Sequence, residues 1–257
     1  MLGMTIPIHL ADGPLGYEAC AIEKRVGLIL LATDHITEAD FARLVTAEST
    51  GVFSTRIVYA NPVTVENLRA LAPRLTEAAA LILPDEKLDV VCFSCTAASV
   101  EIGDDVIAAA IQRAKPGVPV VTLTIASVAG LRALSARRIS LLTPYTTKTS
   151  ELIADYFAAK DFSIESVTCL GLDDDRQIAQ LSRDTKIEKA VAAMSRAADA
   201  LFISCTALRS ASVVAKIEAR IGRPVITSNQ ASAWACLEYC HIPAPSLAAG
   251  RLFAQAT

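Results

Sequence analysis

One short pattern occurs twice in this chain, and it constrains the fold more than any other feature. Residues 89–99 read DVVCFSCTAAS, and residues 199–210 read DALFISCTALRS. Each copy has an aspartate, an apolar run typical of a buried strand, and then Ser-Cys-Thr-Ala. Cys95 and Cys205 are 110 residues apart in a chain of 257, so each half contributes one of them. The alternative is a structural origin, in which two core strands merely end in small polar residues.

Further pieces of sequence repeat in the same order and at similar spacing. Residues 25–29 (RVGLI) correspond to residues 138–142 (RISLL), and residues 117–122 (GVPVVT) correspond to residues 222–227 (GRPVIT). Continuous apolar runs favour strands of a parallel sheet that is covered on both faces, and helical patterns follow them here. We therefore predict an α/β fold with two pseudo-symmetric domains, each a small parallel sheet of about four strands flanked by helices.

The repeats also predict where the elements and domains lie. The predicted strands are Val26–Ala32, Val52–Tyr59, Asp89–Ser94, Val120–Leu123, Arg138–Leu142, Ile164–Leu170 and Ala200–Ser204, with a last one inside 222–227. The predicted helices are Thr37–Thr46 with Thr37 as its N-cap, Thr64–Leu83 with a kink at Pro73, Ser99–Ala114, Ser150–Lys160, Thr185–Ala198 and Asn229–Tyr239. We expect an N-terminal extension at 1–21, a first repeat at 22–127 and a second at 128–257, with the C-terminal helix packing back on the first repeat.

Both cysteines are expected at one functional site. In open parallel sheets ligands bind at the carboxyl ends of strands, and Cys95 and Cys205 both follow such ends directly before an expected helix. The amides and partial positive charge of a helix N-terminus lower the pKa of a thiol. The amides of Thr96, Ala97, Thr206 and Ala207 would also hold a carboxylate. We expect the two domains to place these thiols on opposite sides of one cleft that holds a small carboxylate.

Composition excludes several classes of protein. A net charge of −3 without a cluster of Arg and Lys argues against nucleic acid as a partner. The N-terminus lacks the features of an export signal, and no run of eighteen apolar residues predicts a membrane span. Seven cysteines, an odd number, indicate reduced thiols and a cytoplasmic location. With three histidines and no second CxxC beside Cys92-x-x-Cys95, zinc or thioredoxin-type chemistry is disfavoured, and we expect no metal and no cofactor.

At this point the residues show a family resemblance, over about Val26 to Pro243. The two Cys-Thr strand ends, Thr33-Asp34 after the first strand and Thr143-Pro144-Tyr145 after the fifth resemble the Asp/Glu racemase superfamily. Within it the chain is most similar to the branch of maleate isomerases and arylmalonate decarboxylases. The runs ANPVTVENLRALAP and SCTAASVEIGD are most similar to the ectoine-utilisation proteins of that branch.

The resemblance implies an enzyme that acts on a small carboxylic acid and forms a homo-oligomer. In the racemases the two cysteines act as opposed acid and base. In maleate isomerases the cysteine matching Cys95 adds to the double bond, the one matching Cys205 transfers a proton, and the tyrosine matching Tyr145 binds substrate. Arylmalonate decarboxylases have glycine at the first cysteine position, so Cys95 disfavours decarboxylation here.

Two residues depart from the pattern of the maleate isomerases. That group has asparagine, which contacts the substrate's carboxylates, where this chain has Asp34 and Asp175. An ionised aspartate would repel a carboxylate, so we expect an amino-acid-like or N-acylated diamino acid substrate rather than maleate. Asp34 as an N-cap and Asp175 as part of a solvated turn are the structural alternatives. Arg209 is a further candidate for a substrate carboxylate, whereas His35 is expected to be exposed.

Several alternatives stay open at this stage. Proton exchange at one carbon and cis–trans isomerisation through a thioether both need a pair of thiols. A two-lobed protein that binds a carboxylate without chemistry is a second class. A degenerate family member with a regulatory role in compatible-solute breakdown is a third.

Overall fold

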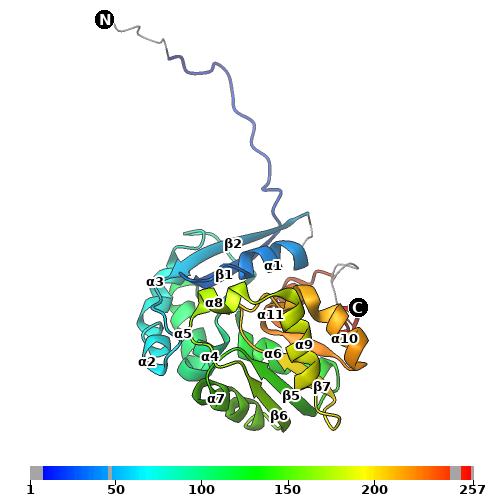
Figure 1. The fold of residues 1–257 in the computed structure, drawn as a ribbon. Helices are drawn as coiled ribbons and strands as arrows, with labels where there is room; N and C mark the ends of the chain where they lie inside the picture. The colour runs from blue at the N-terminus through cyan, green and yellow to red at the C-terminus, as the bar shows by residue number, and fades with distance from the viewer. Residues whose placement is uncertain (1–7, 46–47, 244–249, 256–257) are drawn as a thin grey trace, which may run out of the picture.

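The computed structural model describes residues 8–45, 48–243 and 250–255. Two parallel sheets of four strands each, with helices around them, make up the body of the molecule (Figure 1). The strands of the first sheet are β1 (Lys24–Leu31), β2 (Thr50–Ile57), β3 (Val90–Ser94) and β4 (Val120–Thr122). Those of the second are β5 (Arg138–Thr143), β6 (Ser163–Cys169), β7 (Ala200–Ile203) and β8 (Val225–Thr227). The predicted α/β fold with two four-stranded sheets is confirmed.

The two sheets have the same topology. The strand order is β2-β1-β3-β4 in the first sheet and β6-β5-β7-β8 in the second, and every pairing is parallel. In register, Leu30 on β1 pairs with Ser94 on β3, and Leu142 on β5 pairs with Ile203 on β7. Both cysteine motifs therefore follow a central strand of their sheet, at its carboxyl end.

Helices cover the sheets of both halves. Those of the first half are α1 (Thr37–Leu44), α2 (Val65–Arg69), η1 (Ala72–Arg74), α3 (Leu75–Ala80), α4 (Thr96–Ile102), α5 (Asp104–Ala114) and α6 (Leu123–Ala133). Those of the second half are α7 (Thr147–Ala158), α8 (Asp175–Gln180), α9 (Arg183–Ala193), η2 (Ala211–Val213), α10 (Val214–Ile221), α11 (Ser228–Cys240) and η3 (Phe253–Gln255). Helix α11 packs against α6, α1 and β3, and α4 packs against α7, so the halves share an interface.

The central strands are buried on both faces, as their continuous apolar sequences predict. Leu28, Ile29 and Leu30 on β1 and Leu201 and Phe202 on β7 have no exposed surface. A sheet held rigidly in this way fixes the positions of the residues that follow its carboxyl edge.

Two predicted helices are divided in the structure. The segment expected to form one long helix at Thr64–Leu83 forms α2, η1 and α3, and the 3-10 turn η1 contains Pro73, whose missing amide hydrogen interrupts helical hydrogen bonding. The helix expected at Ser99–Ala114 begins earlier, at Thr96, and divides at Gly103, whose φ of 93° is outside the helical region.

Smaller differences concern helix ends. Thr37 is the first residue of α1 rather than its N-cap, because the side chain of Asp34 accepts hydrogen bonds from the amides of Ile36 and Thr37. The predicted end of this helix at Thr46 lies outside the described residues. Helix α9 ends at Ala193, before the predicted Ala198, and α8 occupies a segment where no helix was predicted.

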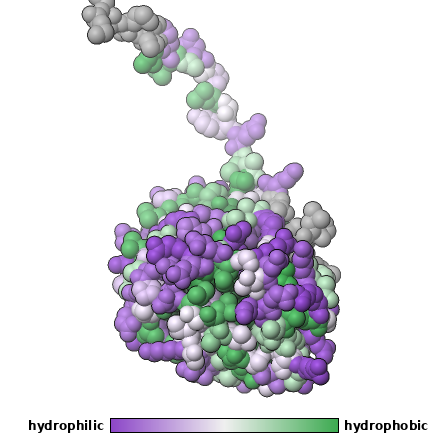
Figure 2. Space-filling view, viewed as in Figure 1, coloured by the Kyte–Doolittle hydropathy of each residue, from purple (hydrophilic) through white to green (hydrophobic). Residues whose placement is uncertain are grey.

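The described part of the N-terminal segment stands away from the body (Figures 1 and 2). Its side chains at Ile8, Leu10, Leu15 and Tyr17 are exposed, whereas hydrophilic residues cover much of the rest of the face in Figure 2. Among the described helices, none has the length and apolar character needed to cross a membrane. The domain limits at 1–21, 22–127 and 128–257 stay a prediction.

Candidate active site

Cys95 lies at the junction between β3 and α4. It has an extended backbone (φ −155°, ψ 113°) and is the N-cap of α4, where its sulfur accepts a hydrogen bond from the Ala98 amide at 3.4 Å. The carbonyl oxygen of Cys95 accepts from the Ser99 hydroxyl at 2.7 Å. The amides of Thr96 and Ala97 have no acceptor within the described part of the chain, as expected in the first turn of a helix. The prediction that a helix follows Cys95 is confirmed.

Cys205 follows β7, but the prediction that a helix begins directly after it is wrong. Residues 206–209 form a turn, and α10 begins at Val214 after the 3-10 turn η2. Cys205 has a φ of 90° and Arg209 a φ of 52°, values that a continuing helix does not allow. Thr206 and Ala207 therefore offer no helix N-terminus. The Ala207 amide instead donates to the Cys205 sulfur, and the Thr206 carbonyl oxygen accepts from Asn229 at 3.1 Å.

The two thiols are close enough to affect one another. The charge of Cys205 raises the pKa of Cys95, and the charge of Asp175 raises the pKa of both thiols. The Tyr145 hydroxyl donates a hydrogen bond to Cys205, and this contact lowers the pKa of that thiol. Cys95, Cys205, Tyr145 and Asp175 are all at most 7% exposed. The structure thus brings together four predicted site residues from the two halves.

The predicted pKa of the thiols is wrong in direction. Burial is the largest influence on both: the pKa of Cys205 is raised to about 12, and that of Cys95 is raised well above its usual value. The amide contact from Ala98 lowers the pKa of Cys95, but removal of the thiolate from water outweighs it. Both cysteines are therefore thiols at neutral pH when the site holds no ligand.

Two aspartates lie near the thiols, and they have different surroundings. The Asp34 carboxylate accepts from the Ile36 and Thr37 amides and from the Thr37 hydroxyl, so it is bonded to the start of α1, although Ile36 and not Asp34 is the N-cap. Asp175 is the first residue of α8, and its Oδ2 accepts from the Thr33 hydroxyl of the other half at 2.7 Å. Within the described chain no donor reaches its Oδ1. Burial raises the pKa of Asp175, and the charge of Asp34 raises it further.

Sequence reasoning missed two residues of this site. Tyr59 follows β2, and its buried hydroxyl oxygen has no partner within the described chain. Burial is the main cause that raises the pKa of Tyr59, and the charges of Cys95, Asp175 and Cys205 raise it further. Ser228 follows β8, and its hydroxyl oxygen accepts from Thr96 Oγ1 at 2.8 Å and from the Cys205 amide at 3.1 Å. Both residues follow carboxyl ends of strands, where polar side chains are candidates for a site.

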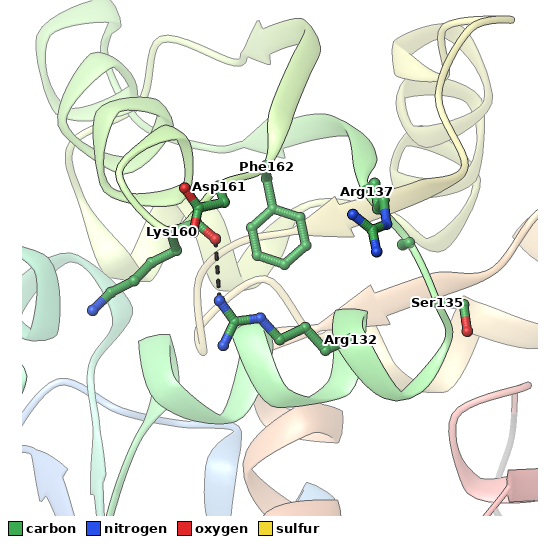
Figure 3. A pocket seen from close by; sticks show the side chains of 7 residues that line it. Arg132, Ser135, Arg137, Lys160, Asp161 and Phe162 are labelled. Atoms are coloured by element: carbon green, nitrogen blue, oxygen red, sulfur yellow. Dashed lines mark hydrogen bonds between the residues drawn. The ribbon is translucent and has the colours of Figure 1, made fainter.

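Surface pockets lie elsewhere or at the margin of this site. The pocket in Figure 3, of about 430 Å³, is lined by Arg132, Arg137 and Phe162 among others and lies at the amino ends of β5 and β6. A second pocket of about 560 Å³ lies among α1, α8 and the turn after Cys205, and His35, Arg176 and Arg209 line it. His35 is exposed, as predicted, and its charge lowers the pKa of Asp175. This second pocket therefore adjoins the candidate site.

Comparison with known proteins gives the chain a family. A sequence profile described as arylmalonate decarboxylase matches residues 63–253, which is more than half of the chain. The chain belongs to the arylmalonate decarboxylase family.

Relatives in the arylmalonate decarboxylase family have two named activities. An arylmalonate decarboxylase of Bordetella bronchiseptica is 30% identical over 125 residues, which is 48% of this chain and only 52% of that protein. A maleate isomerase of Nocardia farcinica is 28% identical over 243 residues, covering 90% of this chain and 96% of that protein.

A solved structure of a Nocardia farcinica maleate cis-trans isomerase mutant, described with a covalently bound succinylcysteine intermediate, has the same fold. Its TM-score is 0.83 at 24% identity, over 91% of this chain and 99% of that one. The family thus agrees with the resemblance to maleate isomerases and arylmalonate decarboxylases.

Proposed function

We propose that this protein is a cofactor-independent isomerase or racemase of a small carboxylic acid, and that Cys95 and Cys205 act on the substrate from opposite sides. The observation that carries the proposal is the pair of buried thiols, one from each half, close enough for the charge of one to raise the pKa of the other. Tyr145 beside Cys205 and Asp175 beside both thiols complete the proposed site. The relatives named maleate isomerase support an isomerase, and binding of a carboxylate without chemistry needs no such pair.

In the racemase form of this mechanism one thiolate removes the proton from the carbon beside the carboxylate. The electron pair stays on the substrate as a carbanion delocalised into that carboxylate, and the opposite thiol gives a proton to the other face. The thiolate thus changes sides in each turnover. Amides of Thr96 and Ala97 are the proposed donors to the substrate carboxylate, and Tyr145 stabilises the Cys205 thiolate.

In the cis–trans form Cys95 adds to a carbon of the double bond. A carbon–sulfur bond forms, the π electrons move to the neighbouring carbon, and Cys205 gives that carbon a proton. Cys95 adds as a thiolate, so rotation about the new single bond and the reverse elimination, in which Cys205 takes the proton back, give the trans product and restore the Cys95 thiolate and the Cys205 thiol. The succinylcysteine described for the Nocardia farcinica mutant supports this form for that enzyme.

The surroundings of Asp175 favour a substrate with an N–H group beside its carboxylate. The open Oδ1 of Asp175 would accept a hydrogen bond from an ammonium or amide, whereas the Asp34 carboxylate is bonded to the start of α1. The charged groups with the largest effects on the thiols are acidic, so a substrate ammonium would lower the pKa of both thiols toward neutrality. An amino-acid-like or N-acylated diamino acid meets this requirement, and the resemblance to ectoine-utilisation proteins points the same way.

Incubation of the protein with candidate acids in D2O tests the reaction. The panel contains amino acids, N-acylated diamino acids, maleate and an arylmalonate. Deuterium at the α-carbon with loss of optical activity supports the racemase, and isomerisation with a mass adduct on Cys95 supports the covalent route. Iodoacetamide should abolish this activity, and substrate should protect against it. If no acid in the panel exchanges, isomerises or protects, the proposal fails.

The variant Asp175→Asn tests the class of substrate separately. We expect it to lose turnover of the N–H-bearing acid and to gain turnover of maleate, because an amide can donate to a second carboxylate. Asp174→Asn, at the neighbouring residue that pairs with Arg176, is the matched control and should leave the preference unchanged. If the wild-type protein turns over maleate as efficiently as any amino acid, the assignment of the class is wrong.

A further inference from the structure

The hydroxyl of Ser228 connects the two strand ends that carry the cysteines. Ser228 is the first residue of α11 and has no exposed surface. Its oxygen accepts from the hydroxyl of Thr96, the residue after Cys95, at 2.8 Å. The same oxygen accepts from the backbone amide of Cys205 at 3.1 Å. One atom from a third element is therefore bonded to the motif of each half.

The Cys205 backbone depends on such a partner. Its φ of 90° is uncommon for a residue other than glycine and persists only where the surroundings hold it. No helix follows to fix the residue, and Ser228 is the acceptor that the structure gives for its amide. A buried amide without an acceptor is costly, so Ser228 stabilises the conformation from which the Cys205 side chain projects.

We propose that Ser228 is a positioning residue, which sets the separation and mutual orientation of the Cys95 and Cys205 thiols. Its two hydrogen bonds hold both strand ends to one point, so that both sulfurs reach the same small molecule. The inference rests on the proposed function because it gives Ser228 a role in the joint action of the thiols. Misplacement of a reacting group by about 1 Å costs about a hundredfold in rate, so the loss of this connection should be visible in kcat.

Three variants separate positioning from general stability. Ser228→Ala removes the acceptor, and Ser228→Thr keeps a hydroxyl at the same place. Ser232→Ala is the matched control, because Ser232 is equally buried on α11 and its hydroxyl donates to the carbonyl of Asn229 rather than to a residue of either cysteine motif. Thr96→Val, a fourth and milder variant in case Ser228→Ala does not fold, cuts one of the two bonds.

The first measurement needs no substrate. The reagent 1,3-dibromoacetone alkylates one thiol and then bridges to a second one nearby, with loss of bromide at each step. Mass spectrometry gives the ratio of protein bridged between Cys95 and Cys205 to protein alkylated once. We expect most of the wild-type protein to be bridged. The ratio of bridged to singly alkylated protein should fall about tenfold in Ser228→Ala and by a smaller factor in Thr96→Val. Ser228→Thr should restore the wild-type ratio, and Ser232→Ala should leave it unchanged.

The second measurement uses the acid that the D2O experiment identifies. Ser228→Ala should lower kcat about a hundredfold with little change in KM, and Ser228→Thr should recover most of it. An unchanged bridging ratio in both Ser228→Ala and Thr96→Val, or an equal fall in Ser232→Ala, would overturn the inference. A wild-type protein that forms no bridge would overturn the proposed function together with it. Bridging that depends on Ser228 in a protein without turnover would support the role of Ser228 and reject only the reaction.

Discussion

The strand ends at Cys95 and Cys205 share the sequence Ser-Cys-Thr-Ala, but they are held in different ways. Cys95 is fixed by local bonds, because it caps α4 and its carbonyl accepts from Ser99. Cys205 lies in a turn that distant side chains hold, with Ser228 bonded to its amide, Asn229 to the Thr206 carbonyl and Lys186 to the Arg209 carbonyl. The same four residues follow the apolar part of a central strand in both halves, but they do not determine whether a helix or a turn comes after them.

This difference has a consequence for chemistry. The Cys95 sulfur accepts a hydrogen bond from a helix amide, whereas the Cys205 sulfur receives contacts from an amide and from Tyr145. Burial raises the pKa of both thiols, and the contact from Tyr145 lowers that of Cys205 alone. The two ends should therefore respond differently to substitution of the groups around them.

The largest effect is expected from the cysteines themselves. Cys95→Ser and Cys205→Ser should each lower kcat/KM about a thousandfold, because a serine hydroxyl is a far weaker base and nucleophile than a thiolate. Cys169→Ser, at a half-buried cysteine on β6, is the control and should leave the rate unchanged. Substantial activity left in either active-site variant would show that the two ends do not act as a pair.

Tyr145→Phe should act on the Cys205 end alone. It removes the hydroxyl that lowers the pKa of Cys205, so that pKa should rise, and the increase of rate with pH should move to higher pH. A hydrogen bond to a charged group contributes about 1.5–3 kcal/mol, so kcat/KM should fall about tenfold to a hundredfold. Iodoacetamide alkylation of Cys95 should not slow. Tyr156→Phe, which removes a hydroxyl bonded to Asp104 instead, is the control.

Asp175→Asn should act on both ends in the same direction. The Asp175 charge raises the pKa of Cys95 and Cys205, so its removal lowers both and increases the thiolate fraction at any pH below them. Both cysteines of the ligand-free protein should then be alkylated several times faster at mildly alkaline pH. Asp174→Asn should change neither rate. Slower alkylation of either thiol would contradict the electrostatic account.

The smallest effect is expected from the support behind the turn. Lys186 is buried on α9, and its Nζ donates to the Arg209 carbonyl at 3.3 Å. Lys186→Met keeps the apolar stem and should lower the free energy of unfolding by about 1 kcal/mol. The rate at which iodoacetamide alkylates Cys205 should change, and the rate at which it alkylates Cys95 should not. Lys189→Met, at an exposed position of the same helix, is the control. Equal changes at both cysteines would show that Lys186 does not act on the turn.

The sequence predicts the sheets better than it predicts the connections after them. Apolar runs locate the central strands β1, β3, β5 and β7, because strands buried on both faces leave a clear signal, whereas the edge strands β2 and β6 are partly exposed. The turn after Cys205 was missed because its conformation depends on Ser228, Asn229 and Lys186, which are distant from it in the sequence. A solvated turn is one interpretation of the sequence at Asp175, whereas the structure buries this residue and bonds it to Thr33 of the other half. Contacts of this kind leave no local pattern.

A crystal structure of the Cys205→Ser variant with the identified acid bound tests the central claim most directly. The account predicts that Cys95 Sγ and the serine Oγ lie on opposite sides of the bound molecule and in van der Waals contact with the carbons that react. A bound acid that touches one of these atoms while the other faces a separate cavity would contradict it.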